Sequence, residues 1–261
     1  MQQEVKPSVI VTHLSKHFTL SNAQRKKRKS EDKILKAVDD ISFSLYPGEI
    51  FGLLGPNGAG KTTTLRILAT LLKPSGGSVL IEGFNLNKDS EEIRKRIGFL
   101  TSELKLDNFF TPDYTFDFFA SIYGLGEERR KNRKEFLFQK FGIDEYRYKK
   151  IGELSSGMKQ KVSLAISLLH DPTFIIYDEP TNGLDIIASK AVEDYLLELK
   201  EEGKTIIIST HIMSIIDKLA DRIAIMLDGK IAYLGDAKDV KDEGGLENLF
   251  FRLYKEKEGK R

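Results

Sequence analysis

The stretch Gly55-Pro-Asn-Gly-Ala-Gly-Lys-Thr62 decides the fold of this chain, because it matches the phosphate-binding loop GxxxxGK[ST] at every fixed position. Its glycines let backbone N–H groups close around phosphate oxygens, while Lys61 adds a positive charge and Thr62 offers a hydroxyl to Mg²⁺. The apolar run at residues 49–54 predicts a buried strand before the loop, and leucines at helical spacing predict a helix after it. The alternative is an ordinary turn, which would not require a buried strand before it and a helix after it. A helix N-terminus with its dipole suits a bound anion.

The composition of the chain limits its class. Its 261 residues, 40% of them hydrophobic, are enough for one large domain or two small ones. The net charge of +2 gives no indication of a nucleic-acid partner, and we expect none. Cysteine is absent, which excludes disulfides and thiolate metal sites and suits a reducing compartment. Since no apolar run approaches the length of a membrane span, we expect a membrane role only through a partner.

The N-terminal part predicts strands on either side of a polar segment. Residues 8–14 and 36–46 are rich in β-forming side chains, and we expect both to flank the strand that precedes the phosphate loop. Residues 21–33 between them are polar, with five consecutive basic residues at 25–29. This composition favours a solvated loop, and contact with anionic lipid head groups is the alternative.

The middle of the chain changes in character. Residues 109–123 contain seven aromatic side chains, and a charged helical pattern follows at residues 127–138. No strand alternates with these helices, so we predict a helical insertion into an α/β body. The aromatic side chains favour a small core of their own, and a ligand-binding cluster is the alternative.

The second half predicts a parallel sheet. Residues 174–177 and 205–210 are apolar and β-branched, and amphipathic helical patterns separate them, as expected of strands covered on both faces. Residues 223–227 and 230–234 flank Asp228-Gly229, which predicts a hairpin. The charged remainder, from residue 236 onward, predicts a helix and a frayed end.

Two acidic residues follow the buried strand at residues 174–177. P-loop enzymes hold Mg²⁺ with an acidic residue at this place, which is Asp178 here. Glu179 beside it can accept a proton from the attacking water, or orient that water. By residue chemistry alone, ATPases, GTPases and small-molecule kinases all fit.

The choice narrows when four motifs are taken in their order. They are GPNGAGKTT at residues 55–63, LSSGMKQK at 154–161, IIYDEPTNGLD at 175–185 and STH at 209–211. Together they resemble the ATP-binding subunit of an ABC transporter, and the likeness extends from about Val9 to Gly235. A small-molecule kinase or GTPase would leave the second and fourth motifs unexplained.

The resemblance implies an architecture and a set of domain boundaries. The fold would be a P-loop NTPase of the RecA-like kind, with a parallel sheet core, an antiparallel β subdomain and an inserted α-helical subdomain. The whole chain, residues 1–261, would be one ATPase domain. Its core and β subdomain would occupy residues 1–100 and 165–235, its helical subdomain residues 101–164 and its tail residues 236–261.

The resemblance also assigns roles to individual residues. Nucleotide contacts fall to Phe18, Gly55, Pro56, Asn57, Gly58, Ala59, Gly60, Lys61, Thr62, Thr63, Ser155, Ser156, Gly157 and Asp185. Lys61, Glu179 and His211 would be catalytic, with Glu179 as the base or water-orienting carboxylate and His211 on the γ-phosphate. Thr62, Asp178 and Ser102 would serve Mg²⁺. Phe18 would stack on adenine, although an aromatic residue after a strand is as often part of a core.

The resemblance further implies partners. In this family two subunits face each other head to tail, so Ser155 and Gly157 of one copy, at the start of a helix expected near Met158, would close the ATP site of the other. Asp185 would contact the opposite subunit. We therefore expect a second ATPase subunit, in a homodimer, and an integral membrane permease that holds the pair at the cytoplasmic face of the membrane. A soluble relative that remodels ribosomes or nucleic acid is the alternative, although such proteins usually carry two cassettes or a long inserted coiled coil.

Two departures from the family pattern bear on the mechanism. Ser102 stands where the family usually has a glutamine that reaches Mg²⁺ and the attacking water, and Glu103 beside it is an alternative ligand. Ser156 adds a side chain where the signature usually has glycine. Both variants are similar to subunits that serve ABC-2-type exporters of sodium, drugs, lipids or polysaccharides. We expect Phe110 and Phe116 to lie near the surface that couples the subunit to its permease.

Overall fold

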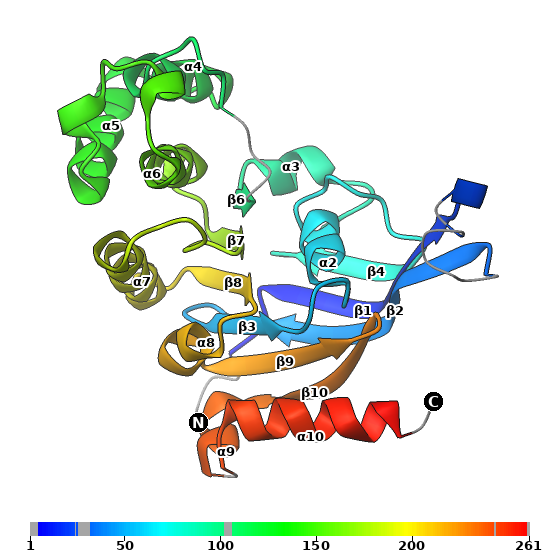
Figure 1. Cartoon of the computed structure of the whole chain (residues 1–261). Helices are drawn as coiled ribbons and strands as arrows, with labels where there is room; N and C mark the ends of the chain where they lie inside the picture. The colour runs from blue at the N-terminus through cyan, green and yellow to red at the C-terminus, as the bar shows by residue number, and fades with distance from the viewer. Residues whose placement is uncertain (1–4, 24, 26–31, 102–105, 243, 260–261) are drawn as a thin grey trace.

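A computed structural model describes residues 5–23, 25, 32–101, 106–242 and 244–259 of the chain (Figure 1). Six strands form its central sheet in the order β10-β9-β3-β8-β7-β6. These strands are β3 (Ile50–Leu54), β6 (Ile97–Thr101), β7 (Phe174–Asp178), β8 (Thr205–Thr210), β9 (Arg222–Leu227) and β10 (Lys230–Asp236). Neighbouring strands from β9 to β6 pair in parallel, which confirms the predicted parallel sheet. The predicted hairpin is also present, because β10 turns back antiparallel to β9 around Asp228 and Gly229.

The central strands divide their side chains between two hydrophobic cores. In β3, Ile50 and Leu54 belong to the core that also contains residues of α6 (Ser156–Leu168), α7 (Ile186–Glu201) and α8 (Met213–Leu219). Phe51 and Leu53 belong to the other core, together with residues of α2 (Lys61–Leu68). Because successive side chains of a strand point to opposite faces, a strand buried on both faces reads as one continuous apolar run.

A second sheet covers the α2 side of the molecule (Figure 1). It has the order β2-β1-β4-β5 and is antiparallel. Its strands are β1 (Val9–Thr19), β2 (Ile34–Leu45), β4 (Gly76–Ile81) and β5 (Phe84–Asn85). The prediction that the first two strands flank the loop strand was wrong, because β3 pairs with β8 and β9 instead. The burial explains this arrangement, since every residue of β3 is buried whereas β1 and β2 each keep exposed residues, as an antiparallel sheet with one open face does.

Helices follow β6 without an intervening strand among the described residues. They are α4 (Pro112–Ile122), α5 (Glu127–Phe141), two 3₁₀ turns at Asp144–Tyr146 and Ile151–Glu153, and then α6. Figure 1 shows α4, α5 and α6 as a lobe beyond the ends of β6 and β7. Phe116 of α4 and Phe138 of α5 pack edge to face inside it, with ring centroids 5.5 Å apart. Part of the aromatic stretch is therefore core, as the packing interpretation of the sequence expected.

The remaining helices lie outside these layers. The short helix α3 (Ser90–Arg94) precedes β6. At the C-terminal end, α9 (Ala237–Asp242) packs on β10, and α10 (Leu246–Glu258) packs on α8 and α9 (Figure 1). In the described part of the chain, none of the helices combines the length and apolar character needed to span a membrane.

Candidate nucleotide-binding site

The phosphate loop connects β3 to α2, and α2 begins at Lys61. Gly58 and Gly60 take φ angles of 83° and 107°, a region that side-chain-bearing residues rarely occupy. A Cβ atom on Gly60 would also collide with the carbonyl oxygen of Ala37. This tight turn brings the chain to the N-terminus of α2, where the first backbone N–H groups have no acceptor within the helix and are available to an anion.

Lys61 lies inside the loop that it follows. Its Nζ donates hydrogen bonds to the carbonyl oxygens of Gly55, at 2.6 Å, and Pro56, at 3.3 Å. Burial lowers the pKa of Lys61, and the nearby carboxylates of Glu179 and Asp178 oppose that shift. A buried cation surrounded by loop backbone is suited to an anionic ligand such as a phosphate group.

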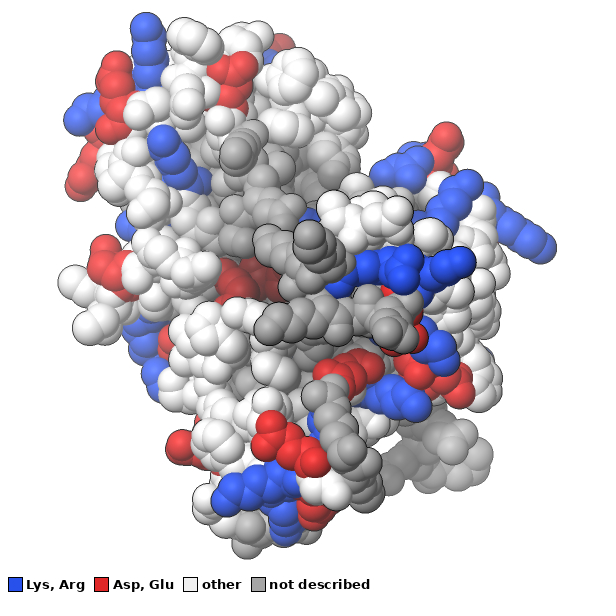
Figure 2. All heavy atoms as spheres, turned by 45° about the vertical axis from the view of Figure 1, so that its right-hand side comes forward, with Lys and Arg blue, Asp and Glu red and all other residues white. Residues whose placement is uncertain are grey.

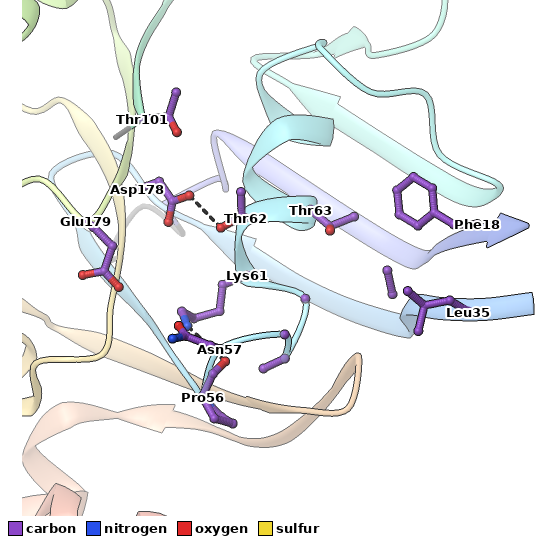
Figure 3. A pocket seen from close by; sticks show the side chains of 14 residues that line it. Phe18, Leu35, Pro56, Asn57, Lys61, Thr62, Thr63, Thr101, Asp178 and Glu179 are labelled. Atoms are coloured by element: carbon purple, nitrogen blue, oxygen red, sulfur yellow. Dashed lines mark hydrogen bonds between the residues drawn. The ribbon is translucent and has the colours of Figure 1, made fainter. Parts of the chain in front are cut away.

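Asp178 is held from two sides at the end of β7. The Thr62 hydroxyl donates to its Oδ2 at 2.7 Å, which is the dashed contact in Figure 3. The Ser209 hydroxyl donates to its Oδ1 from the neighbouring strand β8, where Ser209 is the register partner of Asp178. A hydroxyl and a carboxylate that already touch are the kind of oxygen ligands Mg²⁺ takes from a protein. Among the residues the structure describes, no cluster of three or more acidic, His or Cys side chains could hold a metal.

Glu179 is clamped by the end of β8. Its Oε2 accepts a hydrogen bond from the Thr210 hydroxyl at 3.0 Å, and its Oε1 accepts one from the backbone N–H of His211 at 3.1 Å. The His211 ring reaches the same oxygen, with Nδ1 2.8 Å away. The backbone of Glu179 has a φ of 55°, an uncommon conformation for a residue with a side chain. The carboxylate is therefore fixed in direction next to Asp178.

These groups line one cavity of about 340 Å³ (Figure 3). Residues predicted from the sequence line most of it: Phe18, Pro56, Asn57, Gly58, Ala59, Gly60, Lys61, Thr62, Thr63, Asp178 and Glu179. Figure 3 shows the Phe18 ring at the far end from Glu179, with Leu35 beside it. The cavity thus has an apolar end for a flat ring system and a polar end for phosphates.

Six of the predicted residues that the structure describes do not line this cavity: Gly55, Ser155, Ser156, Gly157, Asp185 and His211. Ser155 and Asp185 are N-caps, since the Ser155 hydroxyl accepts from the Met158 N–H at 3.3 Å and Asp185 Oδ1 accepts from the Ala188 N–H at 2.8 Å. Ser156 and Gly157 open α6, which begins at Ser156 rather than near Met158 as expected. A serine at the N-cap explains the earlier start, because its side chain satisfies an N–H of the first turn.

Two other predictions concern residues that the structure does not describe. Ser102, predicted as a Mg²⁺ contact, and its alternative Glu103 lie outside the described residues. So do residues 26–29 of the basic segment, of which Arg25 alone is described.

Five further residues, which the motifs did not predict, contribute to the site. Leu35, Ala37 and Thr101 line the cavity, and Ser209 and Thr210 hold the two carboxylates. Thr101 and Ser209 are both register partners of Asp178 on adjacent strands. Parallel strands end at a common edge of the sheet, so polar residues at the ends of neighbouring apolar strands lie close together. This pattern in the sequence could have predicted Thr101 and Ser209.

Two features of the site define the class of protein. A phosphate loop lies at a helix N-terminus after β3, and β7, which is separated from β3 by β8 alone, ends in a carboxylate that the Thr62 hydroxyl contacts. This arrangement is that of a P-loop nucleotide-binding ATPase. The family described as ABC transporter matches residues 38–182. The chain belongs to this family, as the order of its four motifs predicted, and it is an ATP-binding transport subunit.

Relatives and solved structures agree with this assignment. The chain is 39% identical over 233 residues to the ABC transporter ATP-binding protein NatA of Bacillus subtilis, covering 89% of this chain and 94% of the relative. It is 34% identical over 214 residues to the daunorubicin resistance ATP-binding protein DrrA3 of Streptomyces coeruleorubidus, covering 82% of this chain and 68% of the relative. A dimeric ATP-binding cassette in a post-hydrolysis state with ADP and Pi superimposes with a TM-score of 0.77 at 25% identity, covering 87% of this chain and 98% of that one. The predicted fold, with its parallel core, antiparallel sheet and helices, is confirmed.

Proposed function

We propose that two copies of this chain enclose ATP and Mg²⁺, hydrolyse the ATP and thereby drive a separate membrane permease. One observation carries the proposal: the cavity joins the phosphate loop to Asp178 and Glu179 but leaves out Ser155, Ser156 and Gly157. A signature sequence at an exposed helix N-terminus suits a phosphate that belongs to another copy. The dimeric state of the structural relative supports this arrangement.

The chemistry we assign to the site is in-line attack of water on the γ-phosphate. Lys61 would orient and neutralise the β- and γ-phosphates, and Glu179 would orient the water and accept its proton. His211, which contacts Glu179, would also reach the γ-phosphate. When bound by Thr62 and Asp178, Mg²⁺ would neutralise charge on the phosphate oxygens.

The aromatic residue Phe18 would hold the adenine ring. It lies at the apolar end of the cavity with Leu35 and Ala37, where a base can stack and lose contact with water. Placing the base at this end would leave the phosphates at the loop, at the polar end of the cavity.

The test is Glu179→Gln. This variant keeps the shape and hydrogen-bonding reach of the side chain but removes the base, so we expect ATP binding to persist, turnover to fall by about a hundredfold or more, and an ATP-bound dimer to accumulate. Phosphate release and light scattering measure the two effects, with Glu198→Gln on an exposed face of α7 as a matched control. Undiminished hydrolysis would remove Glu179 from the role of base.

The permease would dock on the helical lobe. Six large hydrophobic side chains of the aromatic stretch are exposed there, and we call them the α4 surface: Phe109, Phe110, Tyr114, Phe118, Ile122 and Tyr123. In the sequence they follow Thr101, which lines the nucleotide cavity. Such an apolar patch favours a protein partner.

This docking would place the chain at the cytoplasmic face of the membrane. The similarity to a daunorubicin resistance protein and the sequence variants at residues 102 and 156 support export among the transport reactions. We further propose three parts of the chain. The core with its β subdomain would comprise residues 1–100 and 165–235, the helical subdomain residues 101–164, and the tail the residues from 236 onward.

A further inference from the structure

Ile186 and Ile187 are the most exposed large hydrophobic side chains in the described part of the chain. They are 89% and 84% exposed, and they form the first turn of α7 (Ile186–Glu201). The opposite side of the same helix is buried, beginning at Ala188 and Val192. Neither isoleucine belongs to either hydrophobic core.

Local folding does not account for two isoleucines at these positions. The first turn of a helix favours acidic side chains, and that of α7 has none. β-branched residues also lose side-chain freedom in a helix. The cap of the helix is supplied by Asp185, so the isoleucines are not needed to start it.

The surface around the two isoleucines is continuous with the signature motif. Gln160 of α6 donates a hydrogen bond to the carbonyl oxygen of Pro180 at 3.2 Å, which ties α6 to the loop that leads into α7. A Cβ atom on Gly157 would lie 3.4 Å from the carbonyl oxygen of Gly183. The loop before Ile186 therefore packs on the part of α6 that we assign to the second copy's ATP.

We propose that Ile186 and Ile187 pack against a second copy of this chain when ATP closes the dimer. The inference rests on the proposed function, because it takes the face with Ser155 and Gly157 as the dimer face. In a two-fold dimer each surface residue is used twice, so four isoleucine side chains leave water in one closing step. Their burial would add an apolar contribution to an interface that the proposal otherwise assigns to polar groups such as Ser155 and Asp185.

The test uses the absence of cysteine from the chain. Ile187→Cys in the Glu179→Gln background introduces a single thiol, and maleimide labels it at a rate set by its exposure. We expect ATP with Mg²⁺ to slow this labelling by roughly tenfold or more as the dimer forms, because a buried thiol is inaccessible to the reagent. Leu71→Cys is the matched control, since Leu71 is 63% exposed in the turn at the far end of α2, and its labelling should stay unchanged.

The energetic test is the double variant Ile186→Ser and Ile187→Ser in the same background. We expect the dimer dissociation constant with ATP to rise by roughly tenfold or more, while the affinity of the monomer for ATP stays the same. Leu71→Ser should leave both quantities unchanged.

The outcomes separate the two proposals. A dimer that forms with ATP and leaves Cys-directed labelling at position 187 unchanged overturns the role of the isoleucines alone. If light scattering detects no dimer with ATP even in Glu179→Gln, both the isoleucine contact and the proposed dimeric mechanism are overturned.

Discussion

Thr210, at the end of β8, helps to hold the Glu179 side chain in its orientation. Its buried hydroxyl donates to Glu179 Oε2 at 3.0 Å and accepts from the N–H of Ile212 at 3.0 Å. One hydroxyl thus holds the carboxylate and the backbone that follows His211. Because Glu179 itself has an uncommon backbone conformation, surrounding contacts must keep it in place.

We expect Thr210→Val to lower kcat by about tenfold to a hundredfold, because a hydrogen bond to a charged group is lost. The KM for ATP should change little, since Thr210 does not line the nucleotide cavity. Thr210→Ser restores the hydroxyl and should restore kcat, and steady-state phosphate release measures all three proteins. Equal losses in the Val and Ser variants would indicate a packing role instead.

At the scale of the element, the aromatic residues in and just before α4 have two different roles: some pack inside the lobe and others lie on its surface. Phe116 is buried against Phe138, so its side chain is part of the packing of the lobe and does not itself contact a partner, whatever lies near it. Phe110 precedes the helix and is 42% exposed. Both residues share one aromatic-rich stretch, and the direction of each side chain depends on how α4 packs against α5.

We therefore expect Phe110→Asp to lose association with the permease while its ATPase activity without the permease persists. Co-purification with the membrane partner and phosphate release measure the two properties. Phe116→Asp is the contrasting variant, because an unpaired carboxylate in the lobe should lower the free energy of unfolding by about 3 kcal/mol or more. If Phe110→Asp loses both properties together, its side chain is part of the packing.

At the scale of the whole molecule, the proposed dimer gives one copy two halves of different ATP sites. Its cavity gathers the phosphate loop and the carboxylates on one edge of the central sheet, and its signature residues open α6 in the lobe (Figure 1). Among the described residues on the face drawn in Figure 2, basic and acidic side chains lie interspersed.

Complementation between two inactive variants tests this division. Lys61→Ala disables the loop and Ser155→Arg blocks the signature, so each dimer of one variant should be inactive. A mixed dimer keeps one site with both halves intact, and an equal mixture should regain about a quarter of wild-type turnover if the two sites act independently. Phosphate release from the separate and mixed proteins measures it, and a mixture as inactive as its components would contradict sites shared between copies.

The sequence by itself determined the chemistry of this protein. The phosphate loop, Asp178 and Glu179 follow from short motifs next to apolar strands, because a glycine-dependent backbone turn and a strand-end carboxylate are local properties. The parallel sheet and the hairpin at Asp228 were predictable for the same reason, since hydrophobic period and turn composition are read over a few residues.

Only the tertiary structure decided which distant segments meet. Strand order depends on pairing between residues far apart in the chain, so β3 lies between β8 and β9, and Ser209 and Thr210 reach the carboxylates of the neighbouring strand end. The same non-local packing buries Phe116 and exposes Ile186 and Ile187. The residue type alone does not tell whether an apolar side chain belongs to a core or to an interface, because both kinds of site take apolar residues. The surroundings of the side chain in the folded chain distinguish the two.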